Sequence, residues 1–186
     1  MPHRAQAPND RARLGALLLA AAAVLLAGCS SDPGPPPIGG GGPGSQCLQA
    51  GLGKLVTVGG YDLHNAGKYP AKITGIRYPH LHGLRHTSAW LTPILKDPAD
   101  GDWQEIGVGF SWPPGGDPTT DREWARRVPL IGAVIKPGQD PNLSFGLART
   151  GPRAGTVGAP LVTYTENGHT WTANMGFSTV VSPHCH

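Results

Sequence analysis

The sequence lacks the local motifs by which most enzyme families are recognised. It contains no Gly-x-Ser-x-Gly, no His-Glu-x-x-His and no glycine-rich phosphate loop. Separate Ser, His and Asp residues can still meet in a folded active site, because a catalytic triad requires no fixed local spacing. Since no motif points to such a site, we expect a binding or structural protein and not an enzyme.

A hydrophobic run long enough to cross a membrane is also missing. The longest one, Leu14–Ala27, consists almost entirely of Leu, Ala and Val, but it is shorter than the roughly 20 residues that a transmembrane helix requires. It follows a basic start with Arg4, Arg11 and Arg13, an arrangement typical of a secretory signal peptide. These arginines are not adjacent, so a twin-arginine signal is not indicated. Residues 1–28 are therefore predicted to be an export signal, in preference to a buried helix of the folded domain.

The segment Leu26-Ala27-Gly28-Cys29 lies at the end of this apolar run. It resembles the lipobox of bacterial lipoproteins, in which cleavage before the cysteine leaves that residue as a lipidated N-terminus. The resemblance implies that Cys29 is diacylated on its sulfur. We therefore expect a protein that is anchored through lipid to the extracytoplasmic face of the cell membrane, with the membrane as its first partner.

The predicted mature chain has little net charge. The whole sequence carries a formal charge of +3, but Arg4, Arg11, Arg13 and Asp10 all lie in the predicted signal, and their removal leaves the chain close to neutral. A near-neutral domain lacks the electrostatic footprint of a nucleic-acid-binding protein. We therefore expect no nucleic-acid partner.

Large apolar side chains are almost absent from residues 29–45. After Cys29 the segment consists of Ser, Asp, Pro and Gly, with Ile38 as the exception. Such a composition buries too little surface to fold, so we expect a tether between the lipid and a folded domain. That domain is then predicted to span residues 46–186, a length that supports one hydrophobic core.

The predicted domain is interrupted by glycine and proline, which total 28 and 20 in the whole sequence and leave little room for long helices. Short apolar alternations between these breaks predict about eight β-strands, and hence an all-β sandwich. The segments are Lys54–Val58, Ala71–Tyr78, Ser88–Ile94, Glu105–Trp112, Val128–Ile135, Leu143–Leu147, Leu161–Thr165 and Thr170–Phe177.

Two local signals refine this pattern. The alternation in Ala71–Tyr78 changes phase at Thr74-Gly75, and a phase change at glycine indicates a β-bulge. Asn167-Gly168 separates the last two alternating segments, and this dipeptide favours a two-residue β-hairpin turn.

The clearest alternation runs through Glu105–Trp112. It predicts a strand whose Ile106, Val108, Phe110 and Trp112 side chains point into the core.

One short helix is expected beyond this strand. Thr120, with Glu123 three residues later, matches a capping box, and this predicts a helix that runs through Trp124.

A set of turns along the chain resembles that of uncharacterised secreted lipoproteins of actinobacteria. The matching positions are Asn65-x-Gly67, Pro70-Ala71-x-Ile73, Gly83-Leu84, Trp112-Pro113-Pro114, Pro137-Gly138 and the terminal hairpin that runs to Cys185. The resemblance implies an immunoglobulin-like β-sandwich, and it carries no binding or catalytic residues.

Cys47 and Cys185 remain once Cys29 is assigned to lipid. They lie at the two ends of the predicted domain, in a compartment where disulfides persist, so we expect them to pair. In the alternative, Cys185 is a metal ligand between His184 and His186.

Three histidines, His80, His82 and His86, lie within seven positions. Their imidazoles are suited to Cu or Zn, so an extracytoplasmic copper- or zinc-binding lipoprotein is the alternative function. We prefer the interpretation that they are polar loop residues and that the protein has no cofactor. The loops 80–86 and 112–121 are where we expect a protein or cell-wall ligand to bind, because loops at the ends of a sandwich carry function.

The lipobox generates the first testable prediction. A Cys29→Ser variant should no longer incorporate labelled fatty acid and should move from the membrane fraction to the medium, because stable anchoring needs at least two acyl chains on this residue. Ser31→Ala is the matched control and should remain with the membrane. Normal labelling of the Cys29→Ser variant would rule out this residue as the site of lipidation.

Overall fold

β-Strands are the main regular secondary structure of the structure, a computed structural model that describes residues 38–39, 42–109 and 111–185. These residues belong to one unit, Pro36–His186. The strands are β1 (Ile38–Gly39), β2 (Gly44–Gln49), β3 (Leu55–Asp62), β4 (His64–Asn65), β5 (Ala71–Arg77), β6 (Leu84–His86), β7 (Trp90–Thr92), β8 (Leu95–Lys96), β9 (Trp103–Gln104), β10 (Val128–Pro129), β11 (Val134–Ile135), β12 (Asn142–Arg149), β13 (Gly155–Val157), β14 (Leu161–Glu166), β15 (His169–Asn174) and β16 (Phe177–Ser182). One short helix, α2 (Pro118–Ala125), accompanies them in the described residues, where no helix is long and apolar enough to span a bilayer.

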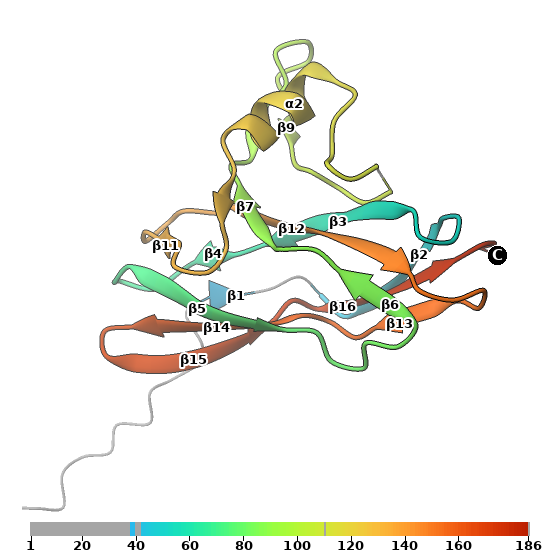
Figure 1. The fold of residues 1–186 in the computed structure, drawn as a ribbon. Coiled ribbons are helices and arrows are strands. Elements are labelled where there is room, and N and C mark those ends of the chain that lie inside the picture. Colours follow the sequence, from blue (N-terminus) through green and yellow to red (C-terminus); the bar gives the residue numbers. More distant parts are fainter. Residues whose placement is uncertain (1–37, 40–41, 110, 186) are drawn as a thin grey trace, which may run out of the picture. The chain divides into compact units, whose positions relative to one another are not determined.

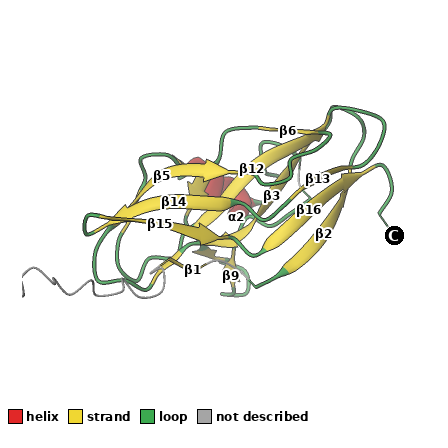
Figure 2. Cartoon of the chain, turned by 90° about the horizontal axis from the view of Figure 1, so that it is seen from below, coloured by secondary structure: helices red, strands yellow, loops and turns green. Residues whose placement is uncertain are grey.

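The strands form two layers (Figures 1 and 2). The first layer has the order β10-β7-β12-β3, with β6 also paired to β12. The second layer contains the sheets β11-β5-β14-β15 and β13-β16-β2. Buried hydrophobic side chains from both layers form one cluster between them, so the fold is the predicted β-sandwich.

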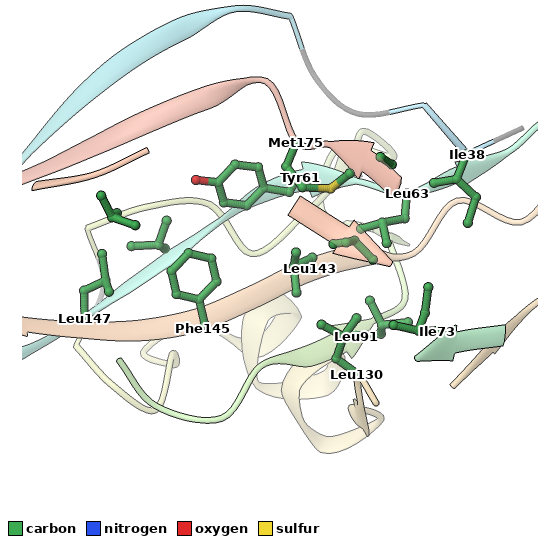
Figure 3. Close-up of a cluster of buried hydrophobic side chains, with 14 of the residues drawn as sticks. Ile38, Tyr61, Leu63, Ile73, Leu91, Leu130, Leu143, Phe145, Leu147 and Met175 are labelled. Atoms are coloured by element: carbon green, nitrogen blue, oxygen red, sulfur yellow. The ribbon is translucent and has the colours of Figure 1, made fainter. Parts of the chain in front are cut away.

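Aromatic rings occupy the middle of this core (Figure 3). Tyr61 of β3 stacks on Phe177 of β16 with 4.0 Å between ring centroids, so it joins the two layers. Leu143, Phe145 and Leu147 are fully buried on β12. Each large side chain buried in this way contributes about 1.5–3 kcal/mol of transfer free energy, which makes this cluster the main source of stability.

Both local signals in the sequence are confirmed. Thr163 is opposite Gly75 and Tyr164 is opposite Ile73, which leaves Thr74 unpaired as a bulge in β5. β14 and β15 form a hairpin around Asn167-Gly168, whose φ angles of 47° and 79° are those that its turn requires.

The expected strand at Glu105–Trp112 is wrong. Ile106 is buried as predicted, but Val108 is exposed, and Phe110 lies outside the described residues. The segment crosses the outer face of the first layer as irregular chain, with the Gly109 amide donating to the Thr57 carbonyl at 3.1 Å. The segment is not a strand, although Ser111 forms one antiparallel bridge with Val56 of the edge strand β3. Its alternation reflects contact with the sheet that it covers.

Two glycines make this covering possible. An added Cβ at Gly59 would coincide with the carbonyl oxygen of Ile106, and one at Gly146 would lie 2.8 Å from the Trp112 ring. The chain therefore lies directly on the backbone of β3, and the Trp112 ring lies on that of β12.

The expected start of the helix is also wrong. α2 begins at Pro118, and its N-cap is Asp117, whose carboxylate accepts hydrogen bonds from the Thr119 and Thr120 amides. Asp before Pro is a strong helix-start signal, so it takes precedence over the capping box at Thr120. Glu123 therefore takes no part in capping the helix, and its side chain is buried.

The expected strand Val128–Ile135 is two strands. β10 pairs with β7 in the first layer, whereas β11 pairs with β5 in the second. Gly132, with φ of 88°, lies in the connection between the layers. Breaks of this kind explain why the described chain has more and shorter strands than the eight expected.

The boundary of the predicted tether moves toward the N-terminus. Ile38 is only 2% exposed, and β1 pairs with β4. The Ile38 amide also donates to the Tyr164 hydroxyl at 3.0 Å. Residues 44–45 belong to β2, so these parts of the segment 29–45 are integrated in the domain.

The predicted disulfide is confirmed. β2 runs parallel to β16, and Cys47 of β2 is bonded to Cys185 just beyond the end of β16, with 5.8 Å between the Cα atoms. The bond joins the first long strand of the domain to its last. Cys185 is therefore not a thiolate metal ligand in this structure.

Candidate functional site

An open groove of about 670 Å³ lies where the chain passes from the first layer to the second. Its walls come from β7, β10 and β11, from the chain after β7 and from the loop before β12. The lining residues are Leu91, Thr92, Pro93, Ile94, Arg126, Val128, Ala133, Val134, Ile135, Gln139, Asp140 and Pro141. A concave, mostly apolar surface with a few polar groups is the usual form of a binding site.

The apolar side chains of the groove are unusually accessible. Val128 is 48% exposed and Val134 is 53% exposed. Arg126 and Asp140 add one positive and one negative charge to the lining. A ligand could therefore bury apolar surface here and meet charges of both signs.

The groove also includes two free strand edges, because β10 and β11 are the outermost strands of their sheets. The Ile73 main chain bonds to the 132–133 segment, with its amide donating to the Ala133 carbonyl at 2.9 Å. Main-chain groups alternate in direction along an antiparallel strand. Val134, opposite Lys72, therefore directs its N–H and C=O away from β5.

Acidic side chains surround Asp140. Burial, together with the charge of Asp62, raises the pKa of Asp140. Burial, followed by the hydrogen bond and charge of Asp62, raises the pKa of Glu105 to about 7. The nearest basic group to Asp140 is His64, whose Nδ1 lies 3.9 Å from the carboxylate in an exposed pair. This side of the groove favours a positively charged ligand group.

Glu123 forms a hydrogen bond with the chain next to the groove wall. Its side chain is 1% exposed, and its Oε1 accepts a hydrogen bond from the Leu95 amide at 3.2 Å, next to the lining residue Ile94. Its Oε2 is buried and has no hydrogen-bond partner among the described residues. Burial raises the pKa of Glu123 to about 7.

A cluster of tryptophans fixes α2 above the first layer. The Trp124 ring meets the Trp112 ring edge-on at 5.0 Å and the Trp90 ring at 6.0 Å. The Arg127 guanidinium lies 4.6 Å from the Trp124 centroid and 5.1 Å from that of Trp90. The predicted ligand loop 112–121 therefore contributes its tryptophan to packing.

The structure does not bring His80, His82 and His86 together as ligands. His80 is in a left-handed turn with φ of 51°, His82 forms a bridge to Thr156, and the His86 ring packs on Tyr78 at 4.4 Å. In residues 38–39, 42–109 and 111–185, no three His, Cys, Asp or Glu side chains form a group that could hold a metal. The chain turns at His80, so the three histidines do not follow one strand.

Cys29 lies outside the described residues, so the structure does not address its lipidation.

The sequence does not predict the groove, because the pattern of Val128–Ile135 indicates one continuous strand. Gly132 in the middle of that segment is the signal that could have indicated a change of layer.

Comparison with known proteins gives no family. No protein-family model matches the chain, and no curated protein matches it. The VesB protease of Vibrio cholerae superposes with a TM-score of 0.41 at 7% identity, over 78% of this chain and 32% of that one. A PapD-like domain of human CEP192 superposes with a TM-score of 0.36 at 13% identity, over 77% of this chain and 83% of that one. These are distant similarities to β-sandwich domains, and they transfer no function.

The burial of Glu123 predicts a dependence of stability on pH. Because the folded-state pKa is raised from 4.5 to about 7, this group favours folding fully below pH 4.5, and that contribution is lost as the pH rises through 7. Glu123→Gln keeps an acceptor for the Leu95 amide and stays neutral. We expect it to be more stable than the parent by about 1–3 kcal/mol at pH 8 and by less than about 1 kcal/mol at pH 5.

Chemical denaturation at both pH values measures this difference. Asp121→Asn, which removes an exposed carboxylate from the same helix, is the control and should not reproduce the gain at pH 8. A Glu123→Gln variant that is less stable than the parent at pH 8 would contradict the assignment.

Proposed function

We propose that the protein is a lipid-anchored binding protein of the extracytoplasmic membrane face, whose immunoglobulin-like sandwich binds an extended peptide segment of a partner protein. The open groove between β10 and β11 is the observation that carries this proposal. The lipobox at Cys29 supports the location. The pairing of a first long strand, β2, in parallel with the last strand, β16, supports the immunoglobulin-like topology.

An extended peptide fits the groove better than a compact ligand because two strand edges border it. Proteins often bind peptides by adding a strand to a free edge, where main-chain hydrogen bonds give affinity and side-chain contacts give specificity. The outward N–H and C=O of Val134 provide such an edge. Pro129 has no N–H to donate, so β10 offers only acceptors at that position.

The side chains of the groove define what the peptide should carry. Apolar residues would cover Val128 and Val134, which are the exposed large apolar side chains of the lining. A basic residue would lie near Asp140, whose pKa is raised by burial and then by the charge of Asp62. An acidic residue would pair with Arg126, whose side chain is also exposed.

A displayed peptide library tests the proposal. The full chain with Cys29→Ser provides soluble protein, and selected peptides are then measured against two variants. Val134→Asp should weaken binding at least about tenfold, since it places a charge on the apolar edge. Leu52→Asp, at a residue that is 59% exposed and does not line the groove, should leave the affinity unchanged.

Both substitutions are at exposed positions, so thermal melting should confirm that the variants fold normally. Selected peptides whose affinity is insensitive to Val134→Asp, or a library that yields no micromolar binder, would contradict the proposal.

A further inference from the structure

The acidic residues of the domain are unevenly distributed. In the described residues they all lie between Asp62 and Asp140, apart from Glu166. The segments 50–54, 77–86 and 149–155 contain no Asp or Glu, and neither does 182–185. The near-neutral net charge therefore conceals a separation of charge within one domain.

These four segments form a single surface, which we call the basic end. The Gly53 amide donates to the Arg149 carbonyl at 3.1 Å, and the Thr150 amide donates to the Gly83 carbonyl at 3.0 Å. The Ala50 amide donates to the Ser182 carbonyl at 2.9 Å. In Figures 1 and 2, β6, β13 and the C-terminal end of the chain lie at the end of the sandwich away from β1.

Exposed basic side chains lie on the basic end. They are Lys54, Arg77, Arg85 and Arg153, together with the imidazoles of His80, His82, His86 and His184. The ion pair found in the described part of the chain joins His64 to Asp140, so none of these Lys and Arg side chains lies within 4.0 Å of a described carboxylate. Their charges are available to a partner.

A buried arginine organises this surface. Arg149 is 4% exposed, and its guanidinium donates to the carbonyls of Ala50 at 3.2 Å and Pro152 at 2.8 Å. The charge is balanced by carbonyl dipoles and not by a carboxylate, so it adds to the positive potential of the basic end. The same hydrogen bonds fix the loop that carries Arg153. Because this loop is already ordered, it loses less conformational entropy when a ligand binds.

We infer that the basic end binds a linear polyanion of the cell envelope, a polymer with repeated phosphate charges. The cations come from separate segments and do not converge on one cavity, so a chain with many charges complements them better than a small anion does. The exposed aromatic side chains Tyr69 and Trp103 lie in other segments, and the basic end therefore lacks the stacking platform of single-strand nucleic-acid sites.

The proposed lipid anchor at Cys29 would place such a polymer in the cell envelope. This part of the inference rests on the proposed function, whereas the charge separation does not.

Titration of the soluble Cys29→Ser chain with long-chain inorganic polyphosphate tests the inference, measured by calorimetry over a range of salt concentrations. Lys54→Ser/Arg153→Ser should weaken binding at low salt by about tenfold and reduce the salt slope of log affinity by between about one and two. Lys72→Ser/Lys136→Ser is the matched control, because it removes the same charge from exposed positions outside the basic end. It should leave both quantities near those of the parent.

Three results would overturn the inference. One is an absence of polyphosphate binding at low salt, and another is an equal loss in the two double variants, which would show a response to net charge alone. The third is tighter binding of phosphatidylglycerol vesicles or duplex DNA with the same sensitivity to Lys54→Ser/Arg153→Ser, which would assign the surface to a membrane or to nucleic acid. Peptide binding in the groove is tested with Val134→Asp and Leu52→Asp. A failure of the proposed peptide binding can therefore be told apart from a failure of this inference.

Discussion

The architecture of the groove depends on the contact between the segment 105–112 and the outer face of the first layer. Gly59 has no side chain, so the Ile106 carbonyl takes the space in which a Cβ would lie. Asn142 of β12 secures the contact by donating from Nδ2 to the same carbonyl at 2.9 Å. The chain leaves β7 after Thr92 and returns at Val128, and both ends of this excursion line the groove. A contact on one face of a sheet thereby positions a binding surface at its edge.

The same constraint explains the composition of β12. All eight of its residues are buried, which is unusual for a strand in an antiparallel sandwich with one solvated face. Leu143, Phe145 and Leu147 face the core, and Gly146 on the opposite face has no side chain where the Trp112 ring and Thr87 lie against it. A larger residue at Gly146 would displace the Trp112 ring from the sheet.

The sequence predicted features that have a local cause or few alternatives. Asn167-Gly168 requires a specific turn wherever it lies, whereas Cys47 and Cys185 are 138 positions apart but had few other partners. The segment 105–112 was assigned wrongly because alternation records burial on one side and does not distinguish a strand from chain lying over a strand. The distinguishing information is at Gly59, far away in the sequence.

The candidate sites were harder to predict for a related reason. The histidines at 80, 82 and 86 are close in sequence, but turns and pairings direct them to different neighbours. The groove and the basic end are each formed by segments that are distant in sequence. Neither the net charge nor the local spacing of residues predicts which segments meet. Only the strand order brings their residues together.

Native-state hydrogen exchange of a Gly59→Ala variant tests most directly whether the excursion is held by this one contact. An added methyl group meets backbone atoms that cannot move aside, whereas Gly107→Ala places the same group in open space nearby. We expect Gly59→Ala to lose protection at Gly109 and across residues 94–127 while the core strands β12 and β14 stay protected, and Gly107→Ala to match the parent. Equal protection of residues 94–127 in the two variants would contradict the account.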